Sequence, residues 1–266
     1  MSLAKTFECS APVALVTGSA APRVGRAIAL RLAASGCRIA IHARNSIDEG
    51  NRLAEQLIAQ GTEAIVHQAE MQDSDSVEAM IASVVKNFGR LDILVNSAAI
   101  WNPMRLEDVT ADEVRRNLEV NAVGCFVAAK AAGLQMVRQA SGGAIVNISD
   151  WATSRPYLDH AAYFPSKGAV EAMTRSLAVE LAIRNPKVRV NCVQPGPVLL
   201  GDNVDEVVRR QLEDAVLLKR IGTAEEVAHA VEFLCENQFI TGVMLPVDGG
   251  KSIYANDGLQ SGLNTG

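Results

Sequence analysis

Short apolar segments rich in valine and isoleucine alternate along the chain with longer segments of helical periodicity. The apolar segments are Val13 to Thr17, Arg38 to Ala43, Ala64 to His67, Ile93 to Val95, Ala144 to Ile148, Val188 to Val193 and Val243 to Val247. Such short runs are typical of strands that are buried on both faces. Because strands that alternate with helices form right-handed crossovers, the pattern predicts an α/β fold with a doubly wound, parallel, seven-stranded sheet.

The chain carries no linker rich in Pro, Gly or Ser, and no block of one charge that would divide it. Its 266 residues fit one large α/β domain, because such domains often run to about 250 residues. We therefore expect a single domain at 12–255, preceded by an N-terminal extension at 1–11. The polar, glycine-containing residues 256–266 are expected to form a flexible tail.

Composition and charge limit the kinds of partner that the protein can bind and the cellular compartment in which it is expected. With 25 Lys and Arg against 30 Asp and Glu, the net charge is −5, which argues against a nucleic-acid partner. The longest stretch without a charged residue is 14 residues, Cys9 to Pro22, whereas a membrane helix needs roughly 20. The five cysteines form no Cys-x-x-Cys pair, the four histidines are dispersed, and the N-terminus lacks signal-peptide features. We expect a cytoplasmic protein with buried thiols, no metal and no membrane partner.

A loop of small residues follows the first predicted strand, where a helix from about Val24 to Ser35 should begin. Small residues there let the backbone approach a phosphate, and the amides at a helix N-terminus attract negative charge. We therefore predict that Gly18, Arg23, Val24 and Gly25 hold the pyrophosphate of a dinucleotide. An ordinary strand-to-helix turn is the alternative, since short motifs of this kind are common.

The second predicted strand ends in Ile41-His42-Ala43-Arg44-Asn45-Ser46, without the carboxylate that usually binds the adenosine ribose of NAD. A guanidinium at this point favours a 2′-phosphate, because it forms paired, charge-assisted bonds with phosphate oxygens. The segment therefore predicts NADPH, with His42, Arg44, Asn45 and Ser46 near the phosphate. The alternative is that Arg44 is a solvated turn residue and that His42 is a strand residue satisfied by the backbone.

Tyr163 and Lys167 are four residues apart at the start of a helical segment that continues through Leu181, so their side chains share one face. A lysine ammonium near a phenol lowers the phenol pKa from its usual value of about 10 and makes it a proton donor near neutral pH. The pair therefore indicates acid catalysis. Taken alone, such a pair more often consists of two surface residues of an amphipathic helix, and the other motifs of the chain reverse that preference.

Several short motifs occur together in a fixed order: Thr17-Gly18 with Gly25, Asn96-Ser97-Ala98-Ala99, Asn121, Tyr163-Phe164-Pro165-Ser166-Lys167, Pro195-Gly196 and Val247-Asp248-Gly249-Gly250. The combination resembles the short-chain dehydrogenase/reductase family over residues 12–251. The resemblance implies a Rossmann-type fold in which Asn121, Tyr163 and Lys167 form a proton relay, with Tyr163 as the acid and Lys167 also holding the nicotinamide ribose. Further cofactor contacts implied by the resemblance are Glu70, Met71, Asn96, Ser97, Ala98, Pro195, Gly196 and Val198.

Asp150 stands thirteen residues before Tyr163, where this family normally has a serine. A carboxylate cannot donate a hydrogen bond unless it is protonated, so it suits a substrate that offers N–H groups. Together with Arg23, the His42–Arg44 segment and Trp101, it resembles the pteridine reductase and dihydromonapterin reductase subgroup. The resemblance implies NADPH-dependent reduction of a pterin C=N bond, with Trp101, Asp150, Tyr163 and Arg23 as substrate contacts.

Several alternatives stay open. Ser149 serves in place of Asp150 if the strand register slips by one, and Trp101 fills a loop without touching substrate. The activity is otherwise that of an NADPH-dependent carbonyl reductase acting on a 3-ketoacyl thioester or a small ketone, or the chain is a nucleotide-sensing module without chemistry. Residues Asp202 to Leu217 are expected to cover the substrate. The helices at about Asn121 to Ala140 and Tyr163 to Leu181 are apolar enough to predict association with another protein surface. The resemblance implies a homotetramer built partly on these helices.

Overall fold

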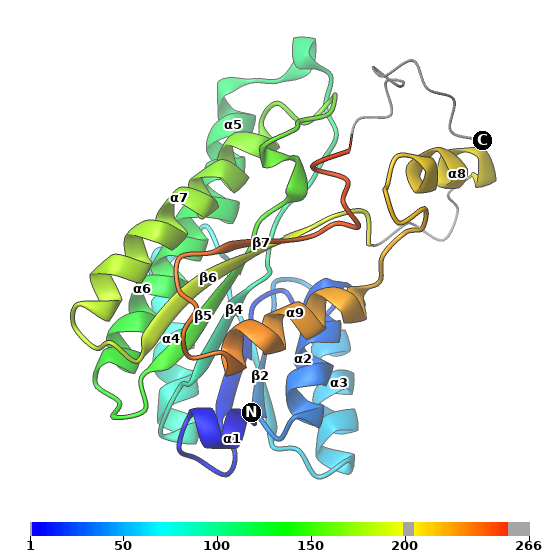
Figure 1. The fold of residues 1–266 in the computed structure, drawn as a ribbon. Coiled ribbons are helices and arrows are strands. Elements are labelled where there is room, and N and C mark those ends of the chain that lie inside the picture. Colours follow the sequence, from blue (N-terminus) through cyan, green and yellow to red (C-terminus); the bar gives the residue numbers. More distant parts are fainter. Residues whose placement is uncertain (1, 199–204, 255–266) are drawn as a thin grey trace.

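The computed structural model describes residues 2–198 and 205–254 (Figure 1). Its strands form one parallel sheet in the order β3-β2-β1-β4-β5-β6-β7. The strands are β1 (Val13–Val16), β2 (Arg38–Ala43), β3 (Ala64–Gln68), β4 (Ile93–Asn96), β5 (Gly143–Ile148), β6 (Val188–Pro195) and β7 (Met244–Val247). This Rossmann-type α/β arrangement confirms the predicted fold class, and the strand ends lie within two residues of the predicted ones.

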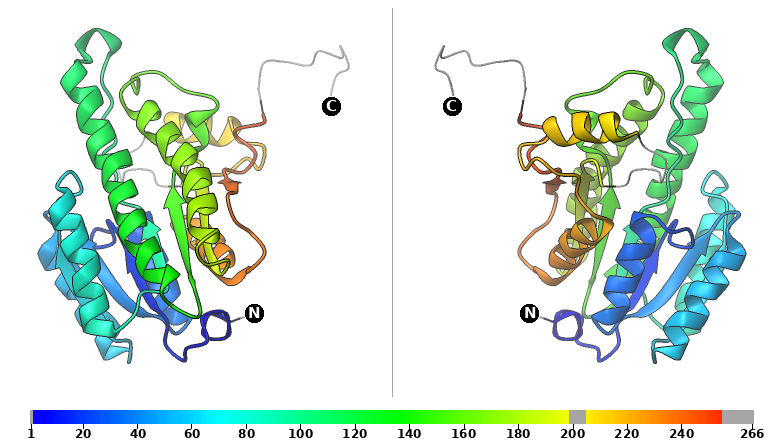
Figure 2. Two further views of the ribbon diagram at one scale, coloured as in Figure 1. Left: turned by 90° about the vertical axis from the view of Figure 1, so that its left-hand side faces the viewer. Right: turned by 90° about the vertical axis from the view of Figure 1, so that its right-hand side faces the viewer.

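Helices cover both faces of the sheet (Figures 1 and 2). One face carries α2 (Val24–Ala34), α3 (Ile47–Ala59) and α9 (Ala224–Glu236), and the other carries α4 (Ser74–Phe88), α6 (Gly124–Val137) and α7 (Tyr163–Ala182). Neighbouring residues of β1 enter opposite cores: Ala14 packs with the α2 side and Leu15 with the α4 side, both fully buried. Double coverage explains why the strands are continuously apolar.

The helix predicted from about Asn121 begins ten residues earlier, so that predicted boundary is wrong. α5 (Ala111–Asn117) leads through a π-helical turn (Leu118–Val123) into α6. Thr110 caps the start by accepting a hydrogen bond from the Glu113 amide, and the acidic first turn suits the helix N-terminus. The run Ala111–Val137 is long and apolar enough to span a membrane by length and composition, but 61% of its most apolar stretch is buried inside the fold.

The predicted N-terminal extension packs against the rest of the chain. It contains α1 (Leu3–Thr6), and the side chains of Leu3 and Phe7 are each 1% exposed within the core that includes α2 and α9. The Thr6 hydroxyl donates to the carbonyl oxygen of Glu236 at the end of α9 (3.4 Å). The domain boundary at residue 12 stays a prediction, and the predicted tail at 256–266 lies outside the described residues. The remaining helix, α8 (Glu206–Asp214), falls within the segment predicted to cover the substrate.

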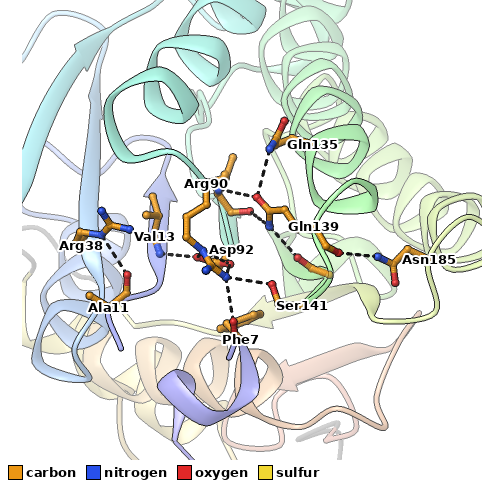
Figure 3. A network of polar contacts seen from close by, with 12 residues as sticks. Phe7, Ala11, Val13, Arg38, Arg90, Asp92, Gln135, Gln139, Ser141 and Asn185 are labelled. Atoms are coloured by element: carbon orange, nitrogen blue, oxygen red, sulfur yellow. Dashed lines mark hydrogen bonds and ion pairs between the residues drawn. The ribbon is translucent and has the colours of Figure 1, made fainter. Parts of the chain in front are cut away.

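A buried carboxylate joins the amino ends of β1 and β4 (Figure 3). The side chain of Asp92 is fully buried and accepts from the Val13 amide (2.9 Å) and from Arg90 Nη2 (2.6 Å). The same guanidinium donates to the carbonyl oxygen of Phe7 (3.0 Å) and to Ser141 Oγ (3.1 Å). Hydrogen bonding to Asp92 raises the pKa of Arg90. One ion pair therefore connects two central strands, the N-terminal segment and the turn before β5.

Removing this guanidinium should destabilise the protein. In Arg90→Ala the buried Asp92 loses its counter-charge, and we expect the free energy of unfolding to fall by about 3 kcal/mol in urea titrations. The matched control is Arg115→Ala, because the Arg115–Asp112 pair is exposed and such pairs contribute little. Equal changes in the two variants would show that the Asp92 network does not carry this stability.

Candidate active site

The carboxyl ends of the central strands bring most of the predicted site residues together. Asp150 follows β5, Tyr163 and Lys167 lie on the first two turns of α7, and Asn121 lies in the π-helical turn. The side chains of Tyr163 and Lys167 are 6% and 4% exposed. The Tyr163 hydroxyl donates to Asp150 Oδ2 (3.1 Å), and Lys167 Nζ donates to the carbonyl oxygen of Ile148 (2.8 Å). The spacing of four residues on α7 thus places the phenol and the ammonium on one face.

Burial dominates the ionisation of these three groups. It raises the pKa of Asp150, although the Ala152 amide, the Lys167 charge and the Tyr163 hydroxyl act in the opposite direction. It raises the pKa of Tyr163 well above its usual value, and the Asp150 charge and hydrogen bond add to this. It lowers the pKa of Lys167, against the attraction of Cys125 and Asp150. Tyr163 is therefore a protonated donor at neutral pH.

The expectation that Lys167 lowers the pKa of Tyr163 is wrong for this structure. Lys167 Nζ lies 5.8 Å from the centroid of the phenol ring and donates to the backbone of Ile148. The nearest charge to the phenol oxygen is instead the Asp150 carboxylate, which opposes formation of a phenolate.

The alternative in which Ser149 replaces Asp150 is also wrong. Ser149 is 3% exposed, and its hydroxyl lies 2.8 Å from Glu171 Oε1 and 3.2 Å from the carbonyl oxygen of Lys167. It therefore points away from the Tyr163 hydroxyl, as expected for adjacent residues of an extended chain. Asp150 is the side chain that meets the phenol.

Glu171, one turn beyond Lys167 on α7, organises the backbone around Asp150. Its Oε1 accepts from the Ser149 hydroxyl (2.8 Å), the Thr153 hydroxyl (2.6 Å) and Gln194 Nε2 (2.7 Å). These donors come from the end of β5, from the 3-10 turn after Asp150 and from the end of β6. The sequence analysis missed this residue. The available signal was an acidic residue four positions after Lys167, on the helix face that the catalytic candidates share.

The side chain of Asn121 links the loop that contains Ile100 to helix α7 through hydrogen bonds. Its Nδ2 donates to the carbonyl oxygen of Ile100 and to Ser166 Oγ (both 3.0 Å), and its Oδ1 accepts from the Ile100 amide (2.8 Å). The side-chain amide is therefore fully engaged and fixes the loop that carries Trp101. Any part that Asn121 takes in a proton relay has to use its backbone.

A cavity of about 710 Å³ opens beside the Tyr163 hydroxyl. Aromatic side chains form much of its wall, including Trp101, Trp151, Tyr157 and Tyr254. Trp101 is 52% exposed at this wall, and its contact with substrate stays a prediction. Its indole stacks on the His160 ring (centroids 4.8 Å apart), and its Nε1 donates to Tyr157 Oη (3.2 Å). His160 is 6% exposed and acts here as a buried support for the indole.

The predicted phosphate loop has a backbone that only glycine permits. Gly18 has φ +67°, and a Cβ there would lie 2.9 Å from Ala98 Cα. A Cβ on Gly25 would lie 2.6 Å from the carbonyl oxygen of Gly18. The Thr17 hydroxyl accepts from the amides of Ser97 and Ala98 (both 3.0 Å), which joins this loop to the end of β4.

The start of α2 fits an anion. Arg23 occupies the cap position without a side-chain cap hydrogen bond, and the first turn, from Val24, contains no acidic residue. The start of α2 therefore presents the positive end of the helix dipole without a side-chain cap or a carboxylate in its first turn, although the Arg26 amide donates to the carbonyl oxygen of Arg23. Together with the crowded glycines, this arrangement suits the pyrophosphate of a dinucleotide.

The assignment of His42 to the 2′-phosphate is corrected by its contacts. Its ring is 1% exposed, Nδ1 accepts from the Gly18 amide (2.9 Å), and Nε2 lies 3.1 Å from the carbonyl oxygen of Ala69. Nε2 therefore carries the proton and donates, so the ring is neutral, and burial lowers its pKa. His42 is the strand residue satisfied by the backbone, and it positions the glycine loop without reaching the phosphate.

The other predicted cofactor residues lie along the same edge of the sheet. Arg44, Asn45 and Glu70 are exposed at the ends of β2 and β3, and Ser46 caps α3. Asn96 is 4% exposed and donates to Asn147 Oδ1 (3.0 Å). Met71 is buried beside Gly124, Gly196 packs on Asp248 and Pro195 ends β6, while Val198 and Gly196 line the cavity.

Comparison with known proteins agrees with this geometry. A family model described as "Enoyl-(Acyl carrier protein) reductase" matches residues 19–252. The chain belongs to the short-chain dehydrogenase/reductase family. It is 36% identical over 244 residues to the 3-oxoacyl-(acyl-carrier-protein) reductase FabG of Staphylococcus aureus, covering 89% of this chain and 96% of that protein. A Synechocystis protein with the same reductase name is 34% identical over 248 residues (92% and 98%). An uncharacterised oxidoreductase of Methylorubrum extorquens is 33% identical over 245 residues (90% and 96%).

Family membership makes this short-chain dehydrogenase/reductase an NAD(P)-dependent oxidoreductase. The relatives named above do not include a pteridine reductase, so these comparisons support the family without that subgroup. The non-catalytic binding module of the sequence analysis is thereby set aside.

The Glu171 contacts give a prediction for this reductase. Glu171→Leu removes the charged acceptor that the Ser149 hydroxyl, the Thr153 hydroxyl and the Gln194 amide share, and we expect a loss of about 2 kcal/mol in the free energy of unfolding. We also expect at least a tenfold loss of turnover, because the backbone of Asp150 loses its support. Glu180→Leu is the control on the same helix, since Glu180 is exposed and pairs only with Arg184 in the described chain. Unchanged turnover in folded Glu171→Leu contradicts the positioning role.

Proposed function

We propose that this enzyme uses NADPH to reduce a carbonyl group of a small-molecule substrate, with 3-oxoacyl thioesters as the leading substrate class. The observation that carries the reductase activity is the protonated Tyr163 hydroxyl beside buried Lys167, at the wall of a 710 Å³ cavity. The substrate class is supported by the curated relatives, which are named as 3-oxoacyl-(acyl-carrier-protein) reductases. These names favour the carbonyl alternative of the sequence analysis over its pterin interpretation.

The cofactor supplies hydride to the substrate carbon, and the chain supplies the proton. Tyr163 donates its hydroxyl proton to the substrate oxygen as negative charge develops there. Lys167, whose ammonium donates to the carbonyl oxygen of Ile148 beside Tyr163, would bind the nicotinamide ribose of the bound cofactor. The amides at the start of α2 and the exposed guanidinium of Arg23 hold the pyrophosphate, and Arg44 binds the 2′-phosphate that distinguishes NADPH from NADH.

Asp150 decides how a carbonyl substrate is held. In its protonated form, which burial favours, the carboxyl group donates a hydrogen bond to the substrate oxygen and so replaces the serine of the family pattern. In its ionised form it accepts only, and it then repels a carbonyl oxygen. Asp150 therefore assists carbonyl reduction in its protonated form, which its raised pKa makes more accessible.

A pterin is the second candidate, and Asp150 is also the observation that favours it. An ionised carboxylate accepts hydrogen bonds from the N–H groups of a pterin, and the half-exposed indole of Trp101 offers a flat surface at the cavity wall for its rings. In this case Tyr163 would supply its proton to a ring nitrogen of the C=N bond that the cofactor would reduce. Arg23 is then an additional pterin contact.

We further propose a cytoplasmic homotetramer. Four of the five cysteines are buried thiols, in keeping with a reducing compartment. Val123, Phe126 and Leu134 near α6, and Val179 and Ile183 near α7, leave apolar side chains at the surface. A second copy of the chain packed on these two helices buries that apolar area.

The test of the function is NADPH oxidation with acetoacetyl coenzyme A, small ketones and dihydrobiopterin in parallel. We expect turnover of the thioester, and activity that falls as pH rises through the elevated pKa of Asp150, because the ionised carboxylate cannot donate. A pterin substrate gives the opposite slope, because its N–H groups need the ionised form. Absence of turnover with every carbonyl compound refutes the leading proposal.

Asp150→Ser sharpens this test. A serine hydroxyl donates at every pH, so carbonyl turnover should persist in this variant and lose the pH limb. Pterin turnover, in contrast, should fall at least tenfold. Full pterin turnover in Asp150→Ser contradicts the role given to the carboxylate.

The NADPH preference is tested through Arg44. In Arg44→Ala we expect the Kd of NADPH to rise about tenfold, as for a lost charge-assisted pair, while that of NADH stays within about twofold. The control is Arg52→Ala, an exposed arginine of α3. Equal losses for NADPH and NADH refute the assignment of Arg44 to the 2′-phosphate.

A further inference from the structure

The cavity wall carries two cations whose purpose the proposed reaction does not explain. Among the described residues that line it, the charged ones are Asp150, Arg155 and Lys251. The Asp150 carboxylate already accepts hydrogen bonds from the Tyr163 hydroxyl and from the Ala152 amide. Arg155 comes from the loop after β5 and Lys251 from the segment after β7, so two distant parts of the chain converge on this wall.

Neither cation has a carboxylate partner within the described chain. Arg155 Nη1 donates to the carbonyl oxygens of Lys251 and Tyr254, which fixes the guanidinium without neutralising it. Lys251 Nζ lies over the Trp151 ring, 5.1 Å from its centroid. The nearby Asp248 carboxylate is occupied by the amides of Gly250 and Ser252.

Keeping both Arg155 and Lys251 protonated at this wall is energetically unfavourable. Burial lowers the pKa of Lys251, and the charge of Arg155 lowers it further, while Asp248 offsets only part of this. Two like charges at a concave aromatic surface focus a positive potential into the cavity. An anion that binds there relieves the repulsion, whereas a neutral group leaves it in place.

We propose that the substrate carries an anionic group, a carboxylate or a phosphate, which Arg155 and Lys251 bind while the reducible bond lies at Tyr163. The aromatic wall formed by Trp101, Trp151 and Tyr157 contacts the apolar body between the two. This inference rests on the proposed function in taking the cavity as the substrate site. It narrows the substrate class, because neutral ketones of the same size lose one of the two attachment points.

Binding can be measured without turnover, because both tryptophans of the chain, Trp101 and Trp151, line this cavity. We would titrate the protein with phenylacetate, benzylphosphonate and neutral phenylacetamide and follow tryptophan fluorescence. We expect the anions to bind about tenfold more tightly than the amide, with an advantage that shrinks at high salt. The carboxylate and phosphonate arms identify which anion the site prefers. Equal affinity for acids and amide overturns the inference.

Substitutions of the two cations test whether they are the source of the anion preference. In Lys251→Gln and Arg155→Gln the affinity for the preferred anion should fall about threefold to tenfold, while phenylacetamide binding, an internal measure of folding, stays unchanged. Arg184→Gln is the control, since Arg184 lies at the end of α7 and pairs with Glu180 outside the cavity. Losses of equal size for anion and amide, or no loss for the anion, also overturn the inference.

The outcome is separable from that of the proposed function. Anion selectivity without NADPH oxidation refutes the reductase proposal and leaves the anion site standing. If thioesters are reduced, the same variants should raise KM for acetoacetyl coenzyme A, which carries phosphates, and leave KM for the neutral N-acetylcysteamine thioester unchanged. Equal KM shifts for both thioesters refute the anion site while the reductase activity stands.

Discussion

The fold depends on a parallel sheet that is covered by helices on both faces. Every side chain in the middle of β1 is buried, so polar chemistry is displaced to the strand ends. At the amino ends this produces the Asp92 ion pair, which is structural. At the carboxyl ends the same constraint gathers the glycine loop, Asp150 and the first turns of α7 along one edge. The site follows from the direction of the strands more than from any single contact.

At that edge of the sheet, burial of each side chain determines its protonation state. Burial makes the Asp150 carboxyl group easier to protonate and keeps Tyr163 in its phenol form. The two groups share one hydrogen bond, so their protonation states are coupled. A single aspartate in place of serine therefore leaves the acid residue unchanged and alters what the site accepts from a substrate.

Local patterns in the sequence predicted the features that local physics determines. Valine and isoleucine runs located the strands, and Gly18 with Gly25 located a loop that has no room for side chains. The residues that were misjudged depend on distant partners. His42 faces inward because the Gly18 amide and the Ala69 carbonyl oxygen, 24 and 27 residues away, lie on either side of its ring. Lys167 donates to the carbonyl oxygen of Ile148. The spacing of residues along α7 does not predict this hydrogen bond.

The N-terminal segment bears on how this chain folds. Phe7 and Thr6 precede β1 in the chain, yet their partners are Arg90 and the last residue of α9, 83 and 230 positions later. β1 lies in the middle of the sheet, and β4, its partner strand on one side, follows much later in the chain. On the ribosome β1 can pair with β2 and pack against α2 soon after synthesis, whereas its pairing with β4 forms only after residues 93–96 have been made. The residues before β1 therefore complete these hydrogen bonds in two stages, Phe7 once Arg90 is made and Thr6 only once the end of α9 is made.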